Sequence, residues 1–472
     1  MRFAIRPIVL LSCAAICVAC SSAPAYRRPG VEIPASFKEE PGWREATPSD
    51  AVARGEWWQL FNDSGLTELQ QRVVIGNQNL AASKAAYDQA RALVRELRAS
   101  LLPVVSLSAS GTKVGSFGQG NVSVGNTGTV STSGAQRYAI TIGATWEPDL
   151  WGRIGDSVRQ AGALAQASEA DLANATLSAQ GELALNYIQL RGLEAQGKVL
   201  VATIAAYERA LTITTNRYNA GVAARSDVLQ AETALHNARA NNADLERQRA
   251  LLEHAIAVLV GDNPSNFSIA NEEWSRAVPE IPGVLPASLL ERRPDIAGAE
   301  RRVAAANSNI GIARSAYFPT INLSGDAGFN SSTLSALFES VSSVWSLGLT
   351  GALTLLDFGA RSASVDQARA AYEQTVAEYR QAVLVAFQQT EDQLAAVRVL
   401  AVVSTERSAA AVAANGAEKI ANNQYIAGQI GYADVIVAQT AALSARQAEV
   451  QAVVDQQSAA VSLIQAIGGH WR

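Results

Sequence analysis

Cysteine is scarce in this chain of 472 residues, and all three cysteines lie within the first twenty positions, at Cys13, Cys17 and Cys20. The rest of the chain therefore has no cysteine for a disulfide, a catalytic thiolate or a thiolate metal site. Only three histidines and one methionine are present, and the histidines lie far apart without the spacing of a zinc motif. These absences exclude thiol catalysis and the common histidine-based metal sites.

Catalytic and nucleotide-binding motifs are also missing. The sequence has no GxSxG or HExxH motif. The glycine-rich stretch 115–135 lacks both GxGxxG and GxxxxGK[ST], so it is interpreted as a surface loop. The formal net charge is −5 and no run of Lys and Arg stands out, which argues against nucleic acid as a partner. We therefore expect neither an enzyme nor a bound cofactor.

Proline is absent from residues 149–263 and 320–472. Between Gly152 and Gly221 the chain is rich in Ala, Leu, Gln, Glu and Arg, which are good helix formers. Apolar residues recur there at steps of three and four, as they do again after residue 375, and this spacing predicts coiled-coil seams. A helix of about 65 residues would be roughly 100 Å long, far longer than a globular core needs.

The N-terminus has the features of a secretory signal. Arg2 and Arg6 precede an apolar run from Ile8 to Ala19 that is too short to span a bilayer. The residues ending at Cys20 resemble the lipobox of bacterial lipoproteins, in which the cysteine becomes the first mature residue and carries lipid chains. Cys20 is therefore the predicted lipidation site, and this covalent lipid is the only bound group expected. A plain signal cleaved nearby is the alternative.

One short motif occurs twice. Residues 216–232 read NRYNAGVAARSDVLQAE, and residues 423–439 read NQYIAGQIGYADVIVAQ. The positions shared at this offset are Asn216, Tyr218, Ala220, Gly221, Asp227, Val228 and Ala231 in the first copy and Asn423, Tyr425, Ala427, Gly428, Asp434, Val435 and Ala438 in the second. The matching continues upstream through both halves, which indicates a duplicated unit with an internal two-fold repeat.

Each copy of the motif falls where one long helix must end and a second must begin. Gly221 and Gly428 are suited to the left-handed conformation that ends a helix. Asp227 and Asp434 are candidates for a side-chain cap or for an acidic residue in the first turn of the next helix. The sequence therefore predicts two long helical hairpins, each with the motif at its tip.

Four runs alternate apolar and small polar residues, at 104–110, 138–146, 321–329 and 345–355. The residues expected on the apolar face are Tyr138, Ile140, Ile142, Ala144 and Trp146 in the first half and Trp345, Leu347, Leu349, Leu353 and Leu355 in the second. Four strands of about ten residues with this pattern are typical of a membrane β-barrel. Soluble sandwich strands are the alternative, but they would need a second sheet and no other strand-like run is present.

Four strands cannot close a barrel, and an open edge is not tolerated in lipid. The chain must therefore oligomerise. Two copies would supply eight strands around a filled interior, and three would supply twelve with room for a lumen.

The predicted organisation follows from these patterns. A signal peptide (1–19) precedes a lipid-anchored N-terminal segment (20–64), and residues 65–101 and 287–318 form further helices. The remaining predicted segments are a first β-hairpin (102–150), a first helical hairpin (151–260), a linker (261–286), a second β-hairpin (319–357), a second helical hairpin (358–467) and a C-terminal tail (468–472).

With these features together, the chain resembles the TolC family of outer membrane efflux proteins, in its lipoprotein branch (OprM- or NodT-like). The motifs that carry the resemblance are CSSAPAYRRP (20–29), WWQLFND (57–63), the segment 289–325 and the two tips. The resemblance implies an α+β membrane protein that forms a homotrimer. It would have a twelve-stranded outer membrane barrel continued by a coiled-coil α-barrel, and the linker (261–286) would be equatorial.

The resemblance also implies a function and partners. It predicts an exit duct for drugs or other small toxic compounds, docked to a periplasmic adaptor and an inner-membrane RND transporter. The tips would form the periplasmic gate, through Asp434, Ile430, Asp227, Arg225, Tyr218, Tyr425, Gly221 and Gly428. Arg225 would pair with an acid, and Tyr218 and Tyr425 would hydrogen-bond between hairpins. The alternatives are a duct for metal ions or a secreted polypeptide, and a lipid-anchored periplasmic scaffold without a pore.

Overall fold

The computed structural model describes residues 22–30, 38, 55–114, 122–123, 129–130, 135–279 and 293–469. Cys20, the predicted signal peptide, residues 280–292 of the predicted linker and residues 470–472 of the predicted tail lie outside the described residues. The chain divides into two compact units. The first unit comprises Met1–Pro29, Asp88–Ala167 and Glu300–Glu378, and the second comprises Gly30–Tyr87, Ser168–Ala299 and Tyr379–Arg472.

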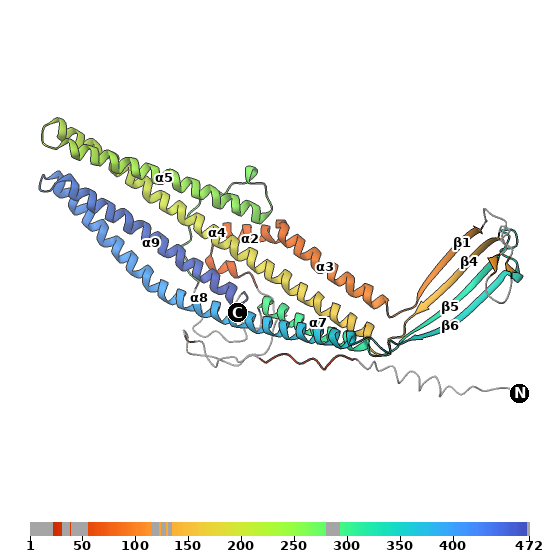
Figure 1. Ribbon diagram of the computed structural model, residues 1–472. Helices are drawn as coiled ribbons and strands as arrows, with labels where there is room; N and C mark the ends of the chain where they lie inside the picture. The colour runs from red at the N-terminus through yellow and green to blue at the C-terminus, as the bar shows by residue number, and fades with distance from the viewer. Residues whose placement is uncertain are drawn as a thin grey trace. The chain divides into compact units, whose positions relative to one another are not determined.

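The first unit contains an antiparallel sheet in the order β1-β4-β5-β6 (Figure 1). Its strands are β1 (Val104–Val114), β4 (Ala135–Trp146), β5 (Thr320–Ser331) and β6 (Ser343–Ala352), and the short 3-10 helix η4 (Ser340–Ser342) precedes β6. The predicted four strands are confirmed. The glycine-rich stretch predicted as a loop contains two further strands of two residues each, β2 (Val122–Ser123) and β3 (Thr129–Val130), which pair with each other.

The register gives the sheet one apolar face and one face of small polar residues. Leu107 pairs with Ile142, Ile142 pairs with Ala327, and Ala327 pairs with Trp345, so one apolar row crosses all four strands. Ser108 and Thr141 pair on the opposite face, where their hydroxyl oxygens are 2.7 Å apart. Leu107, Trp345 and Leu347 are 71%, 82% and 79% exposed in the single chain, which is far more apolar exposure than isolated surface residues explain.

The last predicted strand is too long at its C-terminal end. The pairing of β6 with β5 stops at Ala352, which faces Thr320, the first residue of β5. No strand partner continues beyond this pair, so Leu353 and Leu355 lie outside the strand although their alternation suggested that they belonged to it.

Residues 22–29 pack on α7 (Pro294–Ser315), in the part from Glu300 onward that belongs to the same unit as the sheet. The Asn307 side chain donates to the Pro24 carbonyl at 2.9 Å, and the Tyr26 hydroxyl donates to the Glu300 carboxylate. The Ser22 hydroxyl donates to the Trp151 carbonyl at 3.0 Å. The Trp151 indole in turn stacks on Phe318 and donates to the Pro319 carbonyl at 2.7 Å. Ser22 therefore lies beside the residues that lead into β5.

Two long helical hairpins contain the four longest helices of the described residues. The first joins α4 (Arg153–Asn219, 67 residues) to α5 (Arg225–Val260, 36 residues), and the second joins α8 (Ala360–Ile426, 67 residues) to α9 (Tyr432–Ala466, 35 residues). Leu200, Tyr207, Tyr379 and Leu394, at predicted seam positions, are buried. None of the helices among the described residues has an apolar stretch of the length that a bilayer crossing requires.

The core of the second unit is built around the motif WWQLFND. The 3-10 helix η1 (Trp57–Phe61) inserts Trp57, Trp58 and Phe61 into an apolar cluster formed by residues of α2 (Ser64–Gly76), α4, α5 and α9. The rings of Trp57 and Trp58 meet edge to face at 5.8 Å. The connection after α5, which includes the 3-10 helix η3 (Pro264–Asn266), contributes Phe267 and Trp274 to the edge of this cluster.

A single buried asparagine separates α2 from α3 (Gln78–Ala99). The Asn77 side-chain oxygen accepts from the backbone N–H groups of Asn79 and Leu80 at 2.9 and 3.1 Å, which caps α3. Its side-chain NH₂ donates to the Leu259 carbonyl of α5 at 2.8 Å. Asn77 therefore caps one helix and fixes it against another.

We expect Asn77→Ala to lower the free energy of unfolding by about 1–3 kcal/mol. It removes a helix cap and leaves the Leu259 carbonyl of α5 without the Asn77 donor. Asn79→Ala is the matched control, because Asn79 lies on α3 and is exposed. Chemical unfolding of the detergent-solubilised protein, followed by helical circular dichroism, measures both. Equal midpoints for the two variants would contradict the role assigned to Asn77.

Candidate functional site

Both hairpin tips use the same turn. Gly221 and Gly428 have φ of +74°, a conformation that other L-residues rarely adopt. In the first tip the Val222 N–H donates to the Arg217 carbonyl at 2.8 Å, and in the second the Gln429 N–H donates to the Gln424 carbonyl at 2.9 Å. This is a Schellman ending of α4 and of α8. In each hairpin the glycine therefore fixes the residue at which the chain reverses its direction.

Asp227 and Asp434 lie in the first turns of α5 and α9. The residues at the two N-cap positions are Ala224 and Gly431, and neither makes a side-chain cap hydrogen bond. Of the two roles left open by the sequence, the structure thus gives both aspartates the role of first-turn acid, in which they interact favourably with the helix dipole. The Asp434 side chain is exposed, and Asp227 is half-buried.

The two tips are joined by three residues, Thr214 and Arg217 of α4 and Tyr425 of α8, which we call the inter-hairpin clasp. The Arg217 guanidinium donates to the Tyr425 carbonyl at 2.7 Å and lies over the Tyr425 ring at 4.6 Å. The hydroxyl oxygens of Tyr425 and Thr214 are 3.1 Å apart. Because Tyr425 is 4% exposed, these contacts are shielded from water and each counts for more than it would at an open surface.

Apolar packing supports the clasp. Tyr425 packs with Tyr432, Val435, Ala210 and Ala231 in a buried cluster, and Ile430 lies against it, partly buried. The rings of Tyr425 and Tyr432 are 5.4 Å apart. Ile430 therefore contacts this cluster in the single chain.

The family resemblance predicts that Arg225 pairs with an acid, but in the single chain Arg225 has no acidic partner among the described residues. Its guanidinium lies over the Tyr218 ring at 5.8 Å, within the first hairpin. Tyr425 makes a hydrogen bond between hairpins, whereas Tyr218 is 38% exposed beneath Arg225. The reason is geometric, because Arg225 is the first residue of α5 and faces back onto the end of α4.

Sequence comparison of the two copies did not single out Arg217 or Thr214. At the repeat offset these positions correspond to Gln424 and Ala421, so the duplication gave no signal for them. The residues common to both tips build the turn, whereas the clasp uses residues that differ between the copies. A position in one tip that differs from its counterpart in the other tip is therefore the signal that could have indicated the clasp.

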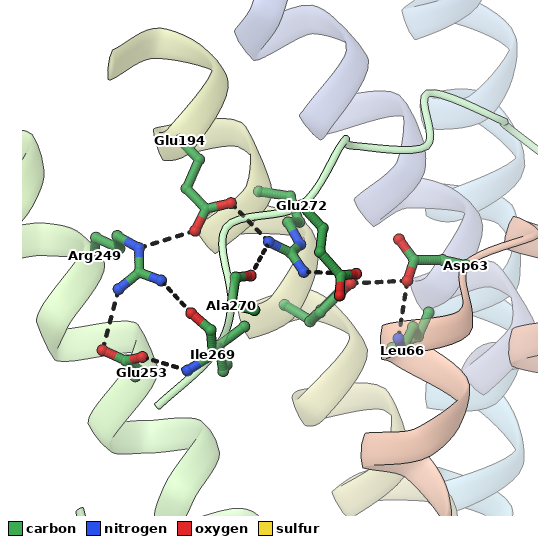
Figure 2. A network of polar contacts seen from close by, with 10 residues as sticks. Asp63, Leu66, Glu194, Arg249, Glu253, Ile269, Ala270 and Glu272 are labelled. Atoms are coloured by element: carbon green, nitrogen blue, oxygen red, sulfur yellow. Dashed lines mark hydrogen bonds and ion pairs between the residues drawn. The ribbon is translucent and has the colours of Figure 1, made fainter. Parts of the chain in front are cut away.

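A second feature that the sequence did not indicate is a buried network of charged residues (Figure 2). Arg191 is 2% exposed and donates to the Glu194 carboxylate and to the Ala270 carbonyl, both at 2.8 Å. Arg249 donates to the other Glu194 oxygen at 2.9 Å and to the Ile269 carbonyl at 2.7 Å. Helices α4 and α5 thereby hold two consecutive carbonyls of the connection after α5.

The network continues to α2. The Tyr187 ring lies under the Arg191 guanidinium at 4.9 Å, and its hydroxyl donates to Asp63 at 2.7 Å. The same Asp63 oxygen accepts from the Leu66 N–H at 2.9 Å, which caps α2 (Figure 2). Burial, together with the hydrogen bond to Asp63, raises the pKa of the Tyr187 hydroxyl well above its usual range, so it acts as a donor at any physiological pH.

No group of three or more His, Cys, Asp or Glu able to hold a metal ion occurs among the described residues. The network and the clasp consist of ion pairs, hydrogen bonds and ring contacts, and they hold helices and connections in place.

An antiparallel four-stranded sheet with one apolar face, in a chain with two long helical hairpins, is the architecture of an outer-membrane channel. The outer-membrane channel OprN matches the fold with a TM-score of 0.86 and 28% sequence identity, over 96% of this chain and 100% of that chain. The chain belongs to the outer membrane efflux protein family, whose model matches residues 69–262 and 285–469.

Curated relatives agree with this assignment. The toluene efflux pump outer membrane protein TtgC of Pseudomonas putida is 29% identical over 455 residues, covering 96% of this chain and 93% of that protein. The pyoverdine export outer membrane protein OpmQ of Pseudomonas aeruginosa is 28% identical over 468 residues, covering 99% and 97%. The predicted family is confirmed, and with it an efflux protein of the outer membrane that is not an enzyme.

Tyr432 gives a prediction for alkaline pH. Burial raises the pKa of its hydroxyl to about 12, and the hydroxyl has no hydrogen-bond partner among the described residues. Between pH 10 and about pH 12 the Tyr432 hydroxyl ionises in the unfolded chain but stays protonated in the folded chain. The free energy of unfolding therefore falls as the pH rises. Tyr432→Phe should lessen this fall and leave stability at pH 7 unchanged or higher.

Tyr425→Phe is the matched comparison, because it removes the hydroxyl that contacts Thr214 and should cost about 1 kcal/mol at pH 7. Unfolding midpoints at pH 7 and pH 11 separate the two. A larger loss at pH 7 for Tyr432→Phe than for Tyr425→Phe would contradict the assignment.

The network predicts that Arg191→Met frees the connection after α5. Removing one partner of a buried ion pair costs about 3–5 kcal/mol, and here it also releases the Ala270 carbonyl. Trypsin cleavage after Arg276, in the same connection, should become several times faster, measured by mass spectrometry. Arg247→Met is the control, because Arg247 is exposed and pairs with Asp244 on its own helix. Equal cleavage rates in the two variants would contradict the role of Arg191.

Proposed function

We propose that three copies of this chain form a gated exit duct in the outer membrane. The duct receives small amphiphilic or toxic compounds from an inner-membrane RND transporter through a periplasmic adaptor. The observation that carries the proposal is the sheet, whose two faces differ in polarity and whose outer strands β1 and β6 each pair on one side only.

The unpaired edges of β1 and β6 require partners. Backbone N–H and C=O groups left open in lipid cost several kcal/mol each, so the sheet must continue from one copy to the next. Three sets of four strands make twelve, which leaves space for a lumen lined by the serine and threonine face. The apolar face, with Leu107, Trp345 and Leu347 exposed, would meet lipid.

The helices prolong the passage in this proposal. Each chain supplies the two hairpins of α4 with α5 and of α8 with α9, and three chains would supply a periplasmic wall of helices. The equal lengths of α4 and α8 support descent from one duplicated unit. A wall of this kind needs matched pieces, because a shorter hairpin would leave a gap.

The position of Ser22 supports a lipid anchor on Cys20. Ser22 is held by the Trp151 carbonyl, and Trp151 is held by Pro319, directly before β5. Acyl chains attached two residues earlier would emerge at the level where the strands begin. Anchor and sheet would then enter the same leaflet, and anchoring by more than one chain is stable.

The gate is assigned to the tips. Asp434 and Asp227 would face the narrowed mouth with Ile430, and Gly221 and Gly428 would fix the turns that present them. Tyr425 would act through the clasp, while Tyr218 and Arg225 would brace the first tip. Like charges from three chains repel, so the clasp must hold the hairpins against that repulsion.

Oxidative cross-linking tests the trimer. Thr350→Cys on β6 is combined in turn with Ser106→Cys, Ser108→Cys, Ser110→Cys and Thr112→Cys on β1, because all native cysteines lie at or before residue 20. At one register we expect covalent dimers and trimers without tetramers. In the control, Ser108→Cys with Thr141→Cys, the disulfide closes within the chain, because these residues already pair. Absence of oligomers at all four positions would contradict the proposal.

Conductance in planar bilayers tests the gate. Arg217→Ala removes the contact between hairpins and should increase the mean single-channel conductance severalfold. Arg239→Ala is the matched control, because Arg239 is exposed and pairs with Glu208 within the first hairpin, so its loss should change conductance little. Equal effects of the two would remove the clasp from the gate, and no channels at all would favour a periplasmic scaffold without a pore.

A further inference from the structure

The polar face of the sheet carries very few charges. Among the described residues of β1, β4, β5 and β6 on this face, one carboxylate, Asp326, and one guanidinium, Arg137, are present. The other side chains on this face are short and uncharged, for example Ser106, Ser108 and Thr141. A single acidic side chain therefore stands among neutral residues near the middle of β5.

The sheet makes a place for the Asp326 side chain. Asp326 pairs with Gly143 on β4 and with Ser346 on β6. A Cβ on Gly143 would lie 2.6 Å from the Asp326 Oδ1 atom, so only glycine leaves room for the carboxylate to extend over β4. The Ser346 hydroxyl donates to the other carboxylate oxygen, Oδ2, at 3.3 Å. Neighbours on both sides therefore hold the carboxylate against the sheet.

The guanidinium on the same face is too distant to neutralise it. Arg137 donates to the Asn330 side chain at 3.3 Å, nearer the hairpin end of the sheet. Asn330 is four residues from Asp326 along β5, roughly 13 Å at the rise of a strand. This distance exceeds the Debye length of about 8 Å at 0.15 M ionic strength, so Arg137 does not cancel the negative charge of Asp326.

We propose that Asp326 makes the strand-lined passage selective for cations, so that positively charged and zwitterionic solutes pass more readily than anions. The inference rests on the proposed trimeric duct, in which three Asp326 carboxylates would face one lumen at the same height. Charged rings of this kind raise the local concentration of counter-ions in a pore with low-dielectric walls. The Asp326 carboxylates would act in the membrane, in addition to the Asp434 and Asp227 carboxylates proposed at the helix tips.

The reversal potential under a gradient of KCl across a planar bilayer tests the inference. The wild-type trimer should prefer K⁺ over Cl⁻ by a permeability ratio of severalfold in 0.1 M salt. Asp326→Asn should reduce the ratio at least twofold, and Asp326→Lys should bring it below one. The wild-type preference should also weaken in 1 M KCl, where the Debye length is about 3 Å.

A rescue variant separates charge from structure. Asp326→Asn combined with Asn322→Asp moves the carboxylate four residues along the same face and should restore part of the preference for K⁺. An unchanged ratio in Asp326→Asn, or a lost preference that the moved carboxylate does not restore, would overturn the inference. Absence of any wild-type conductance would instead overturn the proposed duct, so the two failures are distinguishable.

Discussion

An unfinished sheet is the constraint on which the rest of this structure depends. Its strands pair well inside the chain, yet β1 and β6 each have an open edge, and one whole face is apolar and exposed. The apolar face is not stable in water, and the open edges are not tolerated in lipid, so a single copy suits neither solvent. The backbone hydrogen bonds of the helices are made within each helix. The unpaired backbone groups that favour association therefore lie in the strands. In the proposed trimer, assembly would be a consequence of strand number, and the channel would follow from closing the sheet.

The helical part solves a different problem, which is to keep long rods in register. Apolar seams hold each hairpin together but allow sliding, because every seam position resembles the next. The described polar contacts between elements act at defined points instead. The clasp joins Arg217 to Tyr425 near the tips, and Arg191 and Arg249 fix the connection after α5 further along. The hydrogen bonds of the clasp and those at the connection after α5 therefore set the register of the helices, which the apolar seams alone do not fix.

Periodic features could be predicted from the sequence because they repeat within it. The alternation of strands β4 and β5, the long helices and the turns at Gly221 and Gly428 all depend on neighbours a few residues apart. The clasp and the Arg191 network could not be predicted, because they join residues separated by about two hundred and about eighty positions. An isolated arginine on a helix has no local pattern that reveals which carbonyl it meets. Where β6 ends was missed for a similar reason, since its length is set by β5.

The extended stretch from Ser22 to Gly30 has a consequence for biosynthesis. Its partners, Asn307 and Glu300, lie more than 270 positions later in the chain. The leading end cannot dock until α7 has been made and exported, and it stays loose for most of that time. Attachment of this stretch is therefore one of the last steps in the folding of the first unit.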